Sequence, residues 1–214
     1  MFRTATAADL DEVAALYAAA LGAQCAHPLP TAADLPPGFA PGAETRLRIA
    51  ALGPRNWSGW REGVYPTRPD AQAGLDAGRL YVLQAPDGAI VTSAILNHDQ
   101  PPQYANARWR IPACGAQVAV VHTLVSHPAH RQHGYAGALL SALRALAADW
   151  GCRAVRLDTY RYNLPARALY EKLGYRRAGL IDLGRGAYGL HRYQCYERAC
   201  GWLAAIPGDG LTKA

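Results

Sequence analysis

Several common patterns are missing from this sequence, and each absence narrows its class. Its five cysteines form no C-x-x-C pair, so neither a disulfide framework nor a cysteine-only zinc site is indicated. The apolar stretch near the N-terminus is too short to cross a bilayer, and it follows acidic residues where a secretory signal would have basic ones. Internal repeats and low-complexity arrays are missing as well. We therefore expect a cytoplasmic protein of a reducing compartment, with no membrane partner.

Lysine is nearly absent, because Lys172 and Lys213 are the only two in the chain. The net charge of +6 and the pI of about 9.2 therefore reflect arginine almost entirely. Such a surplus attracts polyanionic small molecules as well as nucleic acid. No dense basic run is present, so we expect scattered, solvated arginines and no nucleic-acid partner. A nucleic-acid-binding module is the alternative, and it would require the arginines to gather on one face.

The length and composition are those of a folded protein with a sizeable core. The chain has 214 residues, of which 50% are hydrophobic and 18% charged. Since no second core-forming pattern is separate from the first, we expect a single domain over residues 1–200. Within it, 25–56 form a proline- and glycine-rich insertion and a helix, and after it 201–214 form a C-terminal tail.

Hydrophobic periodicity and cap residues predict a succession of helices and strands. Thr6 and Asp9 form a capping box ahead of an apolar stripe, and Asp87-Gly88 is a hairpin turn. Helices are expected at 7–21, 44–53, 67–78, 134–150 and 163–174. Strands are expected at 2–6, in a hairpin over 79–96, and at 116–128, 153–160, 175–183 and 188–198.

The order of these segments indicates the fold class. The strand at 116–128 is apolar almost throughout, which is typical of a strand buried on both faces at a sheet centre. A helix links it to the strand at 153–160, and such a unit implies a parallel pair with a right-handed crossover. The fold class is therefore α+β in α/β/α layers: a mixed, mostly antiparallel sheet with one parallel pair and helices on both faces.

The turn between the central strand and the following helix, in HPAHRQHGYAGALL at 127–140, has the chemistry of a phosphate site. Several main-chain N–H groups point one way at the positive end of a helix dipole, and Gly134 has no Cβ to hold a ligand away. Two common phosphate loops are absent from this junction, G-x-x-x-x-G-K-[ST] and G-x-G-x-x-G. Instead the chain has R-x-x-G-x-A, formed by Arg131, Gly134 and Ala136.

This loop and a second motif resemble the GNAT superfamily of N-acetyltransferases. The superfamily signature is a strand ending in x-V-x-P, the loop [QR]-x-x-G-x-[GA], and N-x-x-A-x-x-x-Y-x-x-x-G-[FY]. The last motif corresponds here to Asn163, Ala166, Tyr170, Gly174 and Tyr175. The resemblance spans roughly 2–198 and is strongest over 118–175. It implies an enzyme that transfers the acetyl group of acetyl-CoA to a primary amine by direct attack in a ternary complex.

The resemblance also implies the coenzyme-binding residues. The loop would grip the pyrophosphate through backbone amides and the charge of Arg131, and the pantetheine arm would pair with the backbone of the central strand. The loop residues are Arg131, Gln132, His133, Gly134, Tyr135, Ala136 and Gly137. The strand residues are Leu124, Val125 and Ser126. Asn163 and Tyr170 complete the coenzyme-binding set, and Tyr170 matches the tyrosine that serves as general acid at the thioester sulfur.

The general base is expected at His122, where members of the superfamily often have glutamate. An ordinary histidine pKa of about 6.5 suits a base near neutral pH, although a satisfied core histidine explains His122 almost as well. A metal cluster of His122, His127, His130 and His133 is a sharper alternative. No carboxylate or cysteine nearby completes a tetrahedral set, so we expect no metal.

The acceptor is a small-molecule or peptide amine whose identity the sequence leaves open. The resemblance implies that the acceptor pocket comes from the first helices, the loops after them and the last hairpin. Its aromatic candidates are Tyr17, Trp57, Trp60, Tyr65, Tyr160 and Tyr188. A non-catalytic acyl-CoA sensor is the alternative function, favoured by loss of Tyr170 or of a base. Homodimerisation through the sheet edge or the C-terminal strands is a further hypothesis.

Overall fold

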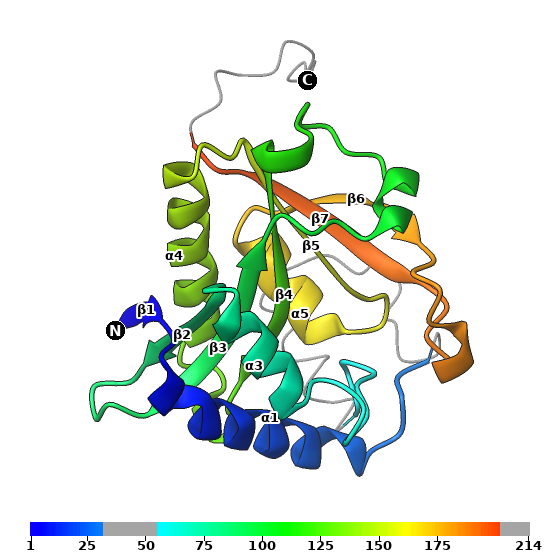
Figure 1. Cartoon of the computed structure of the whole chain (residues 1–214). Helices are drawn as coiled ribbons and strands as arrows, with labels where there is room; N and C mark the ends of the chain where they lie inside the picture. The colour runs from blue at the N-terminus through cyan, green and yellow to red at the C-terminus, as the bar shows by residue number, and fades with distance from the viewer. Residues whose placement is uncertain (32–54, 202–214) are drawn as a thin grey trace, which may run out of the picture.

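A computed structural model describes residues 1–31 and 55–201 of the chain (Figure 1). Two sequence predictions lie outside these residues, namely the helix at 44–53 and nearly all of the tail at 201–214. Most of the proline- and glycine-rich insertion does so as well. All described strands belong to one sheet, and the boundary expected at residue 200 stays a prediction. Within the described ranges, no helix is both long and apolar enough to cross a membrane.

The sheet has seven strands in the order β1-β2-β3-β4-β5-β7-β6. Their bounds are β1 Phe2–Thr4, β2 Leu80–Gln84, β3 Ile90–Asn97, β4 Val118–Ser126, β5 Ala154–Tyr160, β6 Arg176–Ile181 and β7 Tyr193–Ala199. Only β4 and β5 pair in parallel, and every other neighbouring pair is antiparallel. The predicted mixed sheet is thus confirmed. The last strand begins later than predicted, because Gly186–Tyr188 form a 3₁₀ turn and Gly189 follows at φ +76°.

Among the described residues, four α-helices cover the two faces of this sheet. One face carries α1 (Leu10–Cys25) and α3 (Arg68–Asp76), which lie side by side in Figure 1. The other face carries α4 (Tyr135–Asp149) and α5 (Leu164–Lys172). The bounds of α3, α4 and α5 match the predicted helices within two residues, whereas α1 begins three residues and ends four residues later than predicted. The predicted helix N-termini at Thr6 and Thr67 both have a capping box, and the first precedes a short 3₁₀ turn before α1.

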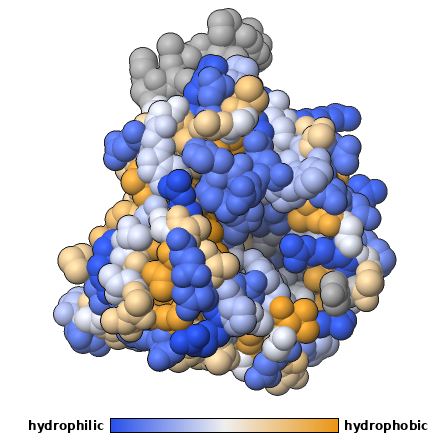
Figure 2. Space-filling model, in the orientation of Figure 1, coloured by the Kyte–Doolittle hydropathy of each residue, from blue (hydrophilic) through white to orange (hydrophobic). Residues whose placement is uncertain are grey.

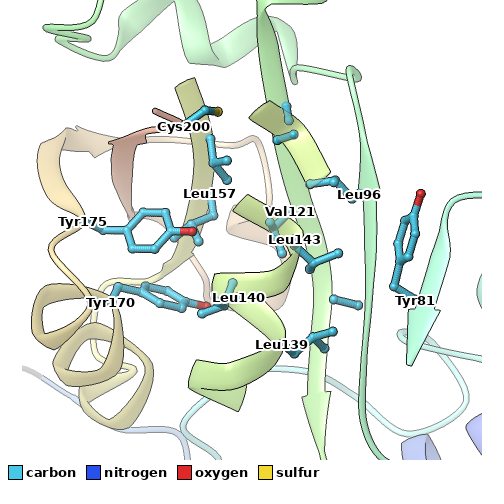
Figure 3. Close-up of a cluster of buried hydrophobic side chains, with 14 of the residues drawn as sticks. Tyr81, Leu96, Val121, Leu139, Leu140, Leu143, Leu157, Tyr170, Tyr175 and Cys200 are labelled. Carbon is cyan, nitrogen blue, oxygen red and sulfur yellow. The ribbon is translucent and has the colours of Figure 1, made fainter. Parts of the chain in front are cut away.

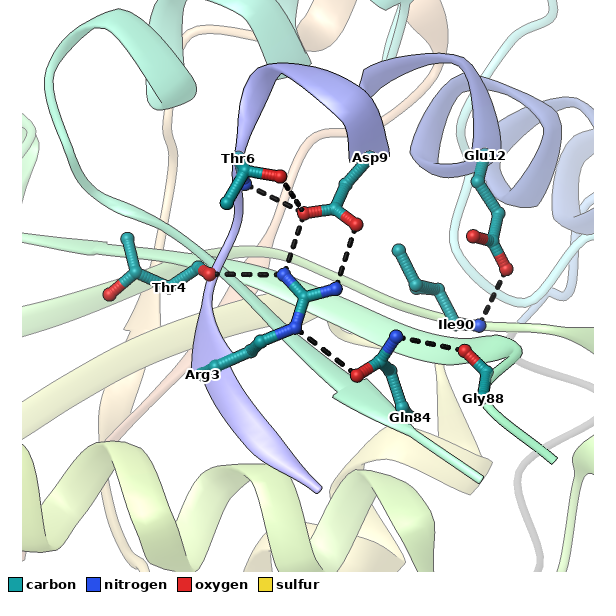
Figure 4. Close-up of polar contacts among 8 residues, drawn as sticks. All are labelled: Arg3, Thr4, Thr6, Asp9, Glu12, Gln84, Gly88 and Ile90. Atoms are coloured by element: carbon teal, nitrogen blue, oxygen red, sulfur yellow. Dashed lines mark hydrogen bonds and ion pairs between the residues drawn. The ribbon is translucent and has the colours of Figure 1, made fainter. Parts of the chain in front are cut away.

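The N-terminal capping box is reinforced by an ion pair. The guanidinium of Arg3 donates to both carboxylate oxygens of Asp9 at 2.6 and 2.7 Å, and the N–H of Thr6 donates to the same carboxylate (Figure 4). The Asp9 side chain is only 10% exposed. These donors hold the pKa of Asp9 far below its usual range, the hydrogen bond from Arg3 being the largest cause.

The central strand β4 is apolar because both of its faces are covered. Ala119 and Val121 pack in the large cluster beneath α4 and α5, part of which Figure 3 shows. Val118 and Val120 point to the opposite face, where they pack against Tyr104. The alternation follows from the period of two along a strand. Burial on both faces, predicted from the unbroken apolar run, is confirmed.

The parallel pair β4–β5 is short, and an opening between the two strands begins where their pairing ends. The two strands pair only from Val118 with Ala154 to Val120 with Arg156, whereas β5 stays paired with β7 as far as Tyr160. Further along β4, Thr123 takes φ +51° at a register shift against β3. Within the described residues, the edge of β4 that faces β5 therefore has no strand partner beyond Val120. An opening through the sheet lies between the separating strands.

Candidate active site

A cavity of about 1240 Å³ occupies this opening. Its walls come from β4 and β5, the turn before α4, one side of α5, residues 57–65 and the loop before β7. Every residue predicted to bind the coenzyme lines the cavity except His133, and the predicted base His122 lines it too. Residues predicted from two separate motifs therefore meet around a single space.

The turn before α4 presents a run of free main-chain donors. Among the described residues, the N–H groups from Gln132 to Gly137 donate no hydrogen bond, and the first paired amide of the helix is that of Ala138. Gln132 at φ +67° and Gly134 at φ +83° turn the chain into the helix. Consecutive free amides at a helix N-terminus attract anions. This geometry matches the phosphate turn predicted from the sequence.

Of the three histidines of this turn, His130 lines the cavity, whereas His127 and His133 do not. His133 is exposed, its ring stacks on Tyr135 with centroids 6.1 Å apart, and it does not line the cavity. The ring Nδ1 of His127 accepts a hydrogen bond from the N–H of Ala129. No group of three or more potential metal ligands occurs within 1–31 and 55–201. The local contacts give His127 a structural explanation, and His133 has no cavity contact.

Tyr170 reaches the cavity from α5, on the face of the sheet that carries α4 and the turn before it. Its ring packs among Leu140 of α4 and neighbouring apolar side chains (Figure 3), and the residue is 6% exposed. Within the described residues its hydroxyl has no hydrogen-bond partner. Burial raises the pKa of Tyr170 far above its usual value, and the nearby carboxylate of Asp158 adds to the rise. The hydroxyl is therefore protonated at neutral pH, as a proton donor requires.

Asn163 serves first as the N-cap of α5. Its Oδ1 accepts from the N–H of Ala166 at 3.3 Å, and its Nδ2 donates to the Thr159 hydroxyl at 3.0 Å. Asn163 lines the cavity seven residues before Tyr170, so both lie on one side of the helix, as predicted. Its side-chain amide is largely used by the fold, which explains an asparagine at this position without a ligand.

His122 lies on β4 with its ring held by the segment after β3. Its Nε2 is 3.0 Å from Oδ1 of Asn97 and 3.1 Å from the carbonyl oxygen of Asp99. The amide of Asn97 is itself fixed, because its Oδ1 accepts from the N–H of Asp99. Two oxygen acceptors around Nε2 require the proton there, which leaves the lone pair on Nδ1. Burial lowers the pKa of His122, so the ring is neutral at neutral pH and its Nδ1 can accept a proton.

Asp158 is a site residue that the sequence analysis missed. It lies on β5, on the same face as His122, and lines the cavity. The hydroxyl of Tyr104 donates to its Oδ1 at 2.7 Å, while Oδ2 has no partner in the described residues. Burial raises the pKa of Asp158, opposed by that hydrogen bond and by the charges of His122 and Arg185. The available signal was a carboxylate inside an apolar strand, AVRLDTY.

The predicted acceptor side is largely present. Trp57, Trp60, Tyr65 and Tyr160 line the cavity. Tyr17 was predicted to do so as well, which is wrong: it is 1% exposed and packs between α1 and the sheet. The side chain of Tyr188 lies outside the described part of the chain. Tyr193 and Arg185 line the cavity in addition, and nothing in the sequence pattern singled them out.

The face drawn in Figure 2 is mainly hydrophilic, with hydrophobic residues in separate groups. Among described residues, the large hydrophobic side chains left exposed are Met1, Val64 and Leu180. A continuous apolar patch of the kind that marks an obligate interface is not visible on this face. Homodimerisation stays a prediction.

Comparison with known proteins agrees with this geometry. Residues 50–175 match the family model described as Acetyltransferase (GNAT) family. The chain is 29% identical over 181 residues to a mycothiol acetyltransferase of Kineococcus radiotolerans, an alignment that covers 84% of this chain and 54% of that protein. The chain thus spans about half the length of this curated relative.

Solved structures share the fold at low sequence identity. A GNAT-family acetyltransferase from Streptococcus agalactiae superposes with a TM-score of 0.64 at 20% identity, covering 93% of this chain and 94% of the other. A phosphinothricin acetyltransferase from Sinorhizobium meliloti, solved with AcCoA, has a TM-score of 0.59 at 18% identity, covering 98% and 94%. The family match extends over more than half of the chain and includes the turn, the cavity strands and Tyr170. This chain belongs to the acetyltransferase (GNAT) family.

Proposed function

We propose that this protein transfers the acetyl group of acetyl-CoA directly to the primary amine of an acceptor bound in the same cavity. The observation that carries the proposal is the opening between β4 and β5, because it joins the two faces of the sheet. The free amides and Tyr170 lie toward the α4 and α5 face. His122, Asp158 and the aromatic wall lie toward the other face.

The coenzyme binds along the first of these faces. The free amides from Gln132 to Gly137 receive the diphosphate, and Arg131 adds positive charge at the same turn. The unpaired edge of β4 at Leu124 and Ser126 offers main-chain groups to the pantetheine amides, as an added strand would. Coenzyme binding thus uses groups that the fold leaves without partners.

The transfer needs a neutral amine and a protonated leaving group. Nδ1 of His122 accepts one proton from the entering ammonium, directly or through water. The amine lone pair then forms the C–N bond at the thioester carbonyl carbon, and the C–S bond breaks. The departing sulfur takes the hydroxyl proton of Tyr170. The second amine proton restores that hydroxyl, and His122 releases its proton to water, so the products are the acetamide and the free thiol.

The test is a panel of primary amines incubated with acetyl-CoA, with release of the free thiol as the readout. Calorimetry with acetyl-CoA alone measures binding independently of the acceptor. We expect binding, together with thiol release that depends on the added amine. Heat of binding without thiol release for any amine would support the acyl-CoA sensor and contradict the enzyme. Absence of both would remove the coenzyme assignment itself.

A further inference from the structure

On the acceptor side, the cavity is lined by an arginine that has no ion pair and donates no hydrogen bond within the described residues. Arg185 is exposed, lines the cavity, and lies in the loop between β6 and β7. Its guanidinium is 5.8 Å from the ring centroid of Tyr65 and 6.0 Å from that of Tyr193. In the described ranges it forms no ion pair and donates no hydrogen bond. The two rings flank the guanidinium, which favours its position over the cavity.

A carboxyl group and a base line the same cavity, namely Asp158 and His122. Tyr104 holds Oδ1 of Asp158, and Oδ2 is left for the cavity. Nδ1 of His122 is likewise without a partner among the described residues. Burial raises the pKa of Asp158 and lowers that of His122, and the charge of Arg185 acts to lower both pKa values although it forms no hydrogen bond or ion pair with either group. The cavity therefore holds a guanidinium and, separate from it, a carboxyl group and an imidazole.

Building on the proposed function, we infer that the acceptor is a small zwitterion. Its reacting ammonium binds beside Asp158 and His122, and an anionic group, a carboxylate or a phosphorus oxyanion, binds Arg185. A guanidinium presents parallel N–H donors that match both kinds of anion. The anion of the acceptor then meets the guanidinium of Arg185, and its ammonium meets the carboxyl group of Asp158 and the imidazole of His122.

The same arrangement disfavours polycations. A second ammonium on a polyamine would face Arg185, and like charges in a partly desolvated site repel more strongly than in water. A neutral amine would leave Arg185 without an anion but would still reach His122. The structure therefore predicts a ranking: amino acids and aminophosphonates first, neutral amines second, and polyamines last.

Matched acceptors test this ranking. The assay compares kcat/KM for L-amino acids, their primary amides, their decarboxylated amines, 1-aminoalkylphosphonates and spermidine. Wild-type protein is expected to prefer an acid over its own amide by roughly tenfold or more, the scale of one hydrogen bond between charged groups. The carboxylate and phosphonate arms tell which anion is preferred. Equal kcat/KM for acids and their amides, or no turnover of any acid, would overturn the inference.

Substitutions of Arg185 distinguish the effect of its charge from a structural effect on the loop between β6 and β7. Arg185→Gln is expected to lower kcat/KM for the acids by roughly ten- to a hundredfold and to leave the amides within about twofold. Arg185→Lys should fall between. Arg192→Gln is the control, because Arg192 is exposed just before β7 and does not line the cavity. Equal losses for acids and amides in Arg185→Gln would make Arg185 a structural residue.

The outcome is distinguishable from failure of the proposed function. If neutral amines release thiol while acids show no advantage, acetyl transfer stands and only the zwitterion inference fails. If acetyl-CoA neither binds by calorimetry nor loses its acetyl group with any amine, the proposed function fails first. Thermal unfolding of each variant checks that it remains folded.

Discussion

Removal of the Tyr170 hydroxyl is the sharpest test of the proposed chemistry. In Tyr170→Phe the ring that packs against α4 is retained, and the structure shows no hydrogen bond of the hydroxyl to lose within the described residues. The free energy of unfolding should therefore change by less than about 1 kcal/mol. Acetyl-CoA affinity should be nearly unchanged too, because the diphosphate is held at the turn before α4.

The expected loss lies in turnover. General acid catalysis contributes about 10²- to 10⁴-fold, which corresponds to about 3–5 kcal/mol of the activation free energy. The raised pKa of Tyr170 does not exclude it as the acid. The same apolar surroundings also disfavour the departing thiolate and raise the pKa of its thiol. The pKa values of the Tyr170 hydroxyl and of the thiol therefore rise together, and proton transfer between them stays feasible. The kcat should fall by about a hundredfold or more at saturating acceptor and coenzyme.

Tyr175→Phe provides the matched control. The two rings are 6.0 Å apart in one cluster, and the Tyr175 hydroxyl is also buried without a partner, but Tyr175 does not line the cavity. We expect wild-type turnover and unchanged or slightly higher stability for this variant. The assay is thiol release with the amine that the panel identifies. Full turnover in Tyr170→Phe, or equal losses in both variants, would refute Tyr170 as the acid.

Three further predictions concern the base, the turn and the N-terminus. His122→Gln should abolish the acidic limb of the kcat profile, which lies below about pH 6.5 because burial lowers the pKa of His122; an unchanged limb rejects it as the base. Gly134→Ala forces φ +83° on alanine and should weaken acetyl-CoA binding about five- to thirtyfold by calorimetry, whereas Gly151→Ala, at φ +79° beyond the other end of α4, should lower stability only. Asp9→Asn should lower the free energy of unfolding by about 1–3 kcal/mol at neutral pH. The folded-state pKa of Asp9 is depressed, so the carboxylate stabilises the fold fully above the unfolded pKa of about 3.9, and this stability is lost as the pH falls from there through the folded pKa. The difference in unfolding free energy between wild type and Asp9→Asn should therefore be smaller at pH 3 than at pH 7, as measured by chemical denaturation.

The parts of the site that the sequence predicts are those determined by neighbours along the chain. A buried strand, a left-handed glycine and a helix follow one another within about twenty residues, so the turn at Gly134 could be assigned from local chemistry. The capping box at Thr6 and the spacing of Asn163 from Tyr170 are local in the same sense. Each of these predictions needed only the geometry of a turn or a helix.

The parts that were missed or misassigned depend on distant segments. Tyr17 belongs to the apolar stripe of α1, but the period of a helix does not tell which residues border a cavity. Asp158 lines the cavity because the pairing of β5 with β4 ends at Arg156, two residues before it. Arg185 reaches the same space from a loop whose position depends on β7 lying between β5 and β6. Strand order and strand separation are tertiary properties that no window of sequence contains.

The backbone of β4 is distorted at Thr123, three residues beyond its last pair with β5. Thr123 is β-branched and takes φ +51°, a conformation that costs about 1–3 kcal/mol and persists only where the surroundings hold it. Its hydroxyl is hydrogen-bonded to that of Tyr65, a wall of the acceptor side. The next residues, Leu124 to Ser126, form the edge that we propose pairs with the coenzyme. Under the proposed function, Thr123 therefore joins the acceptor wall to the coenzyme strand, and a shift of Tyr65 would reach that strand through this single residue.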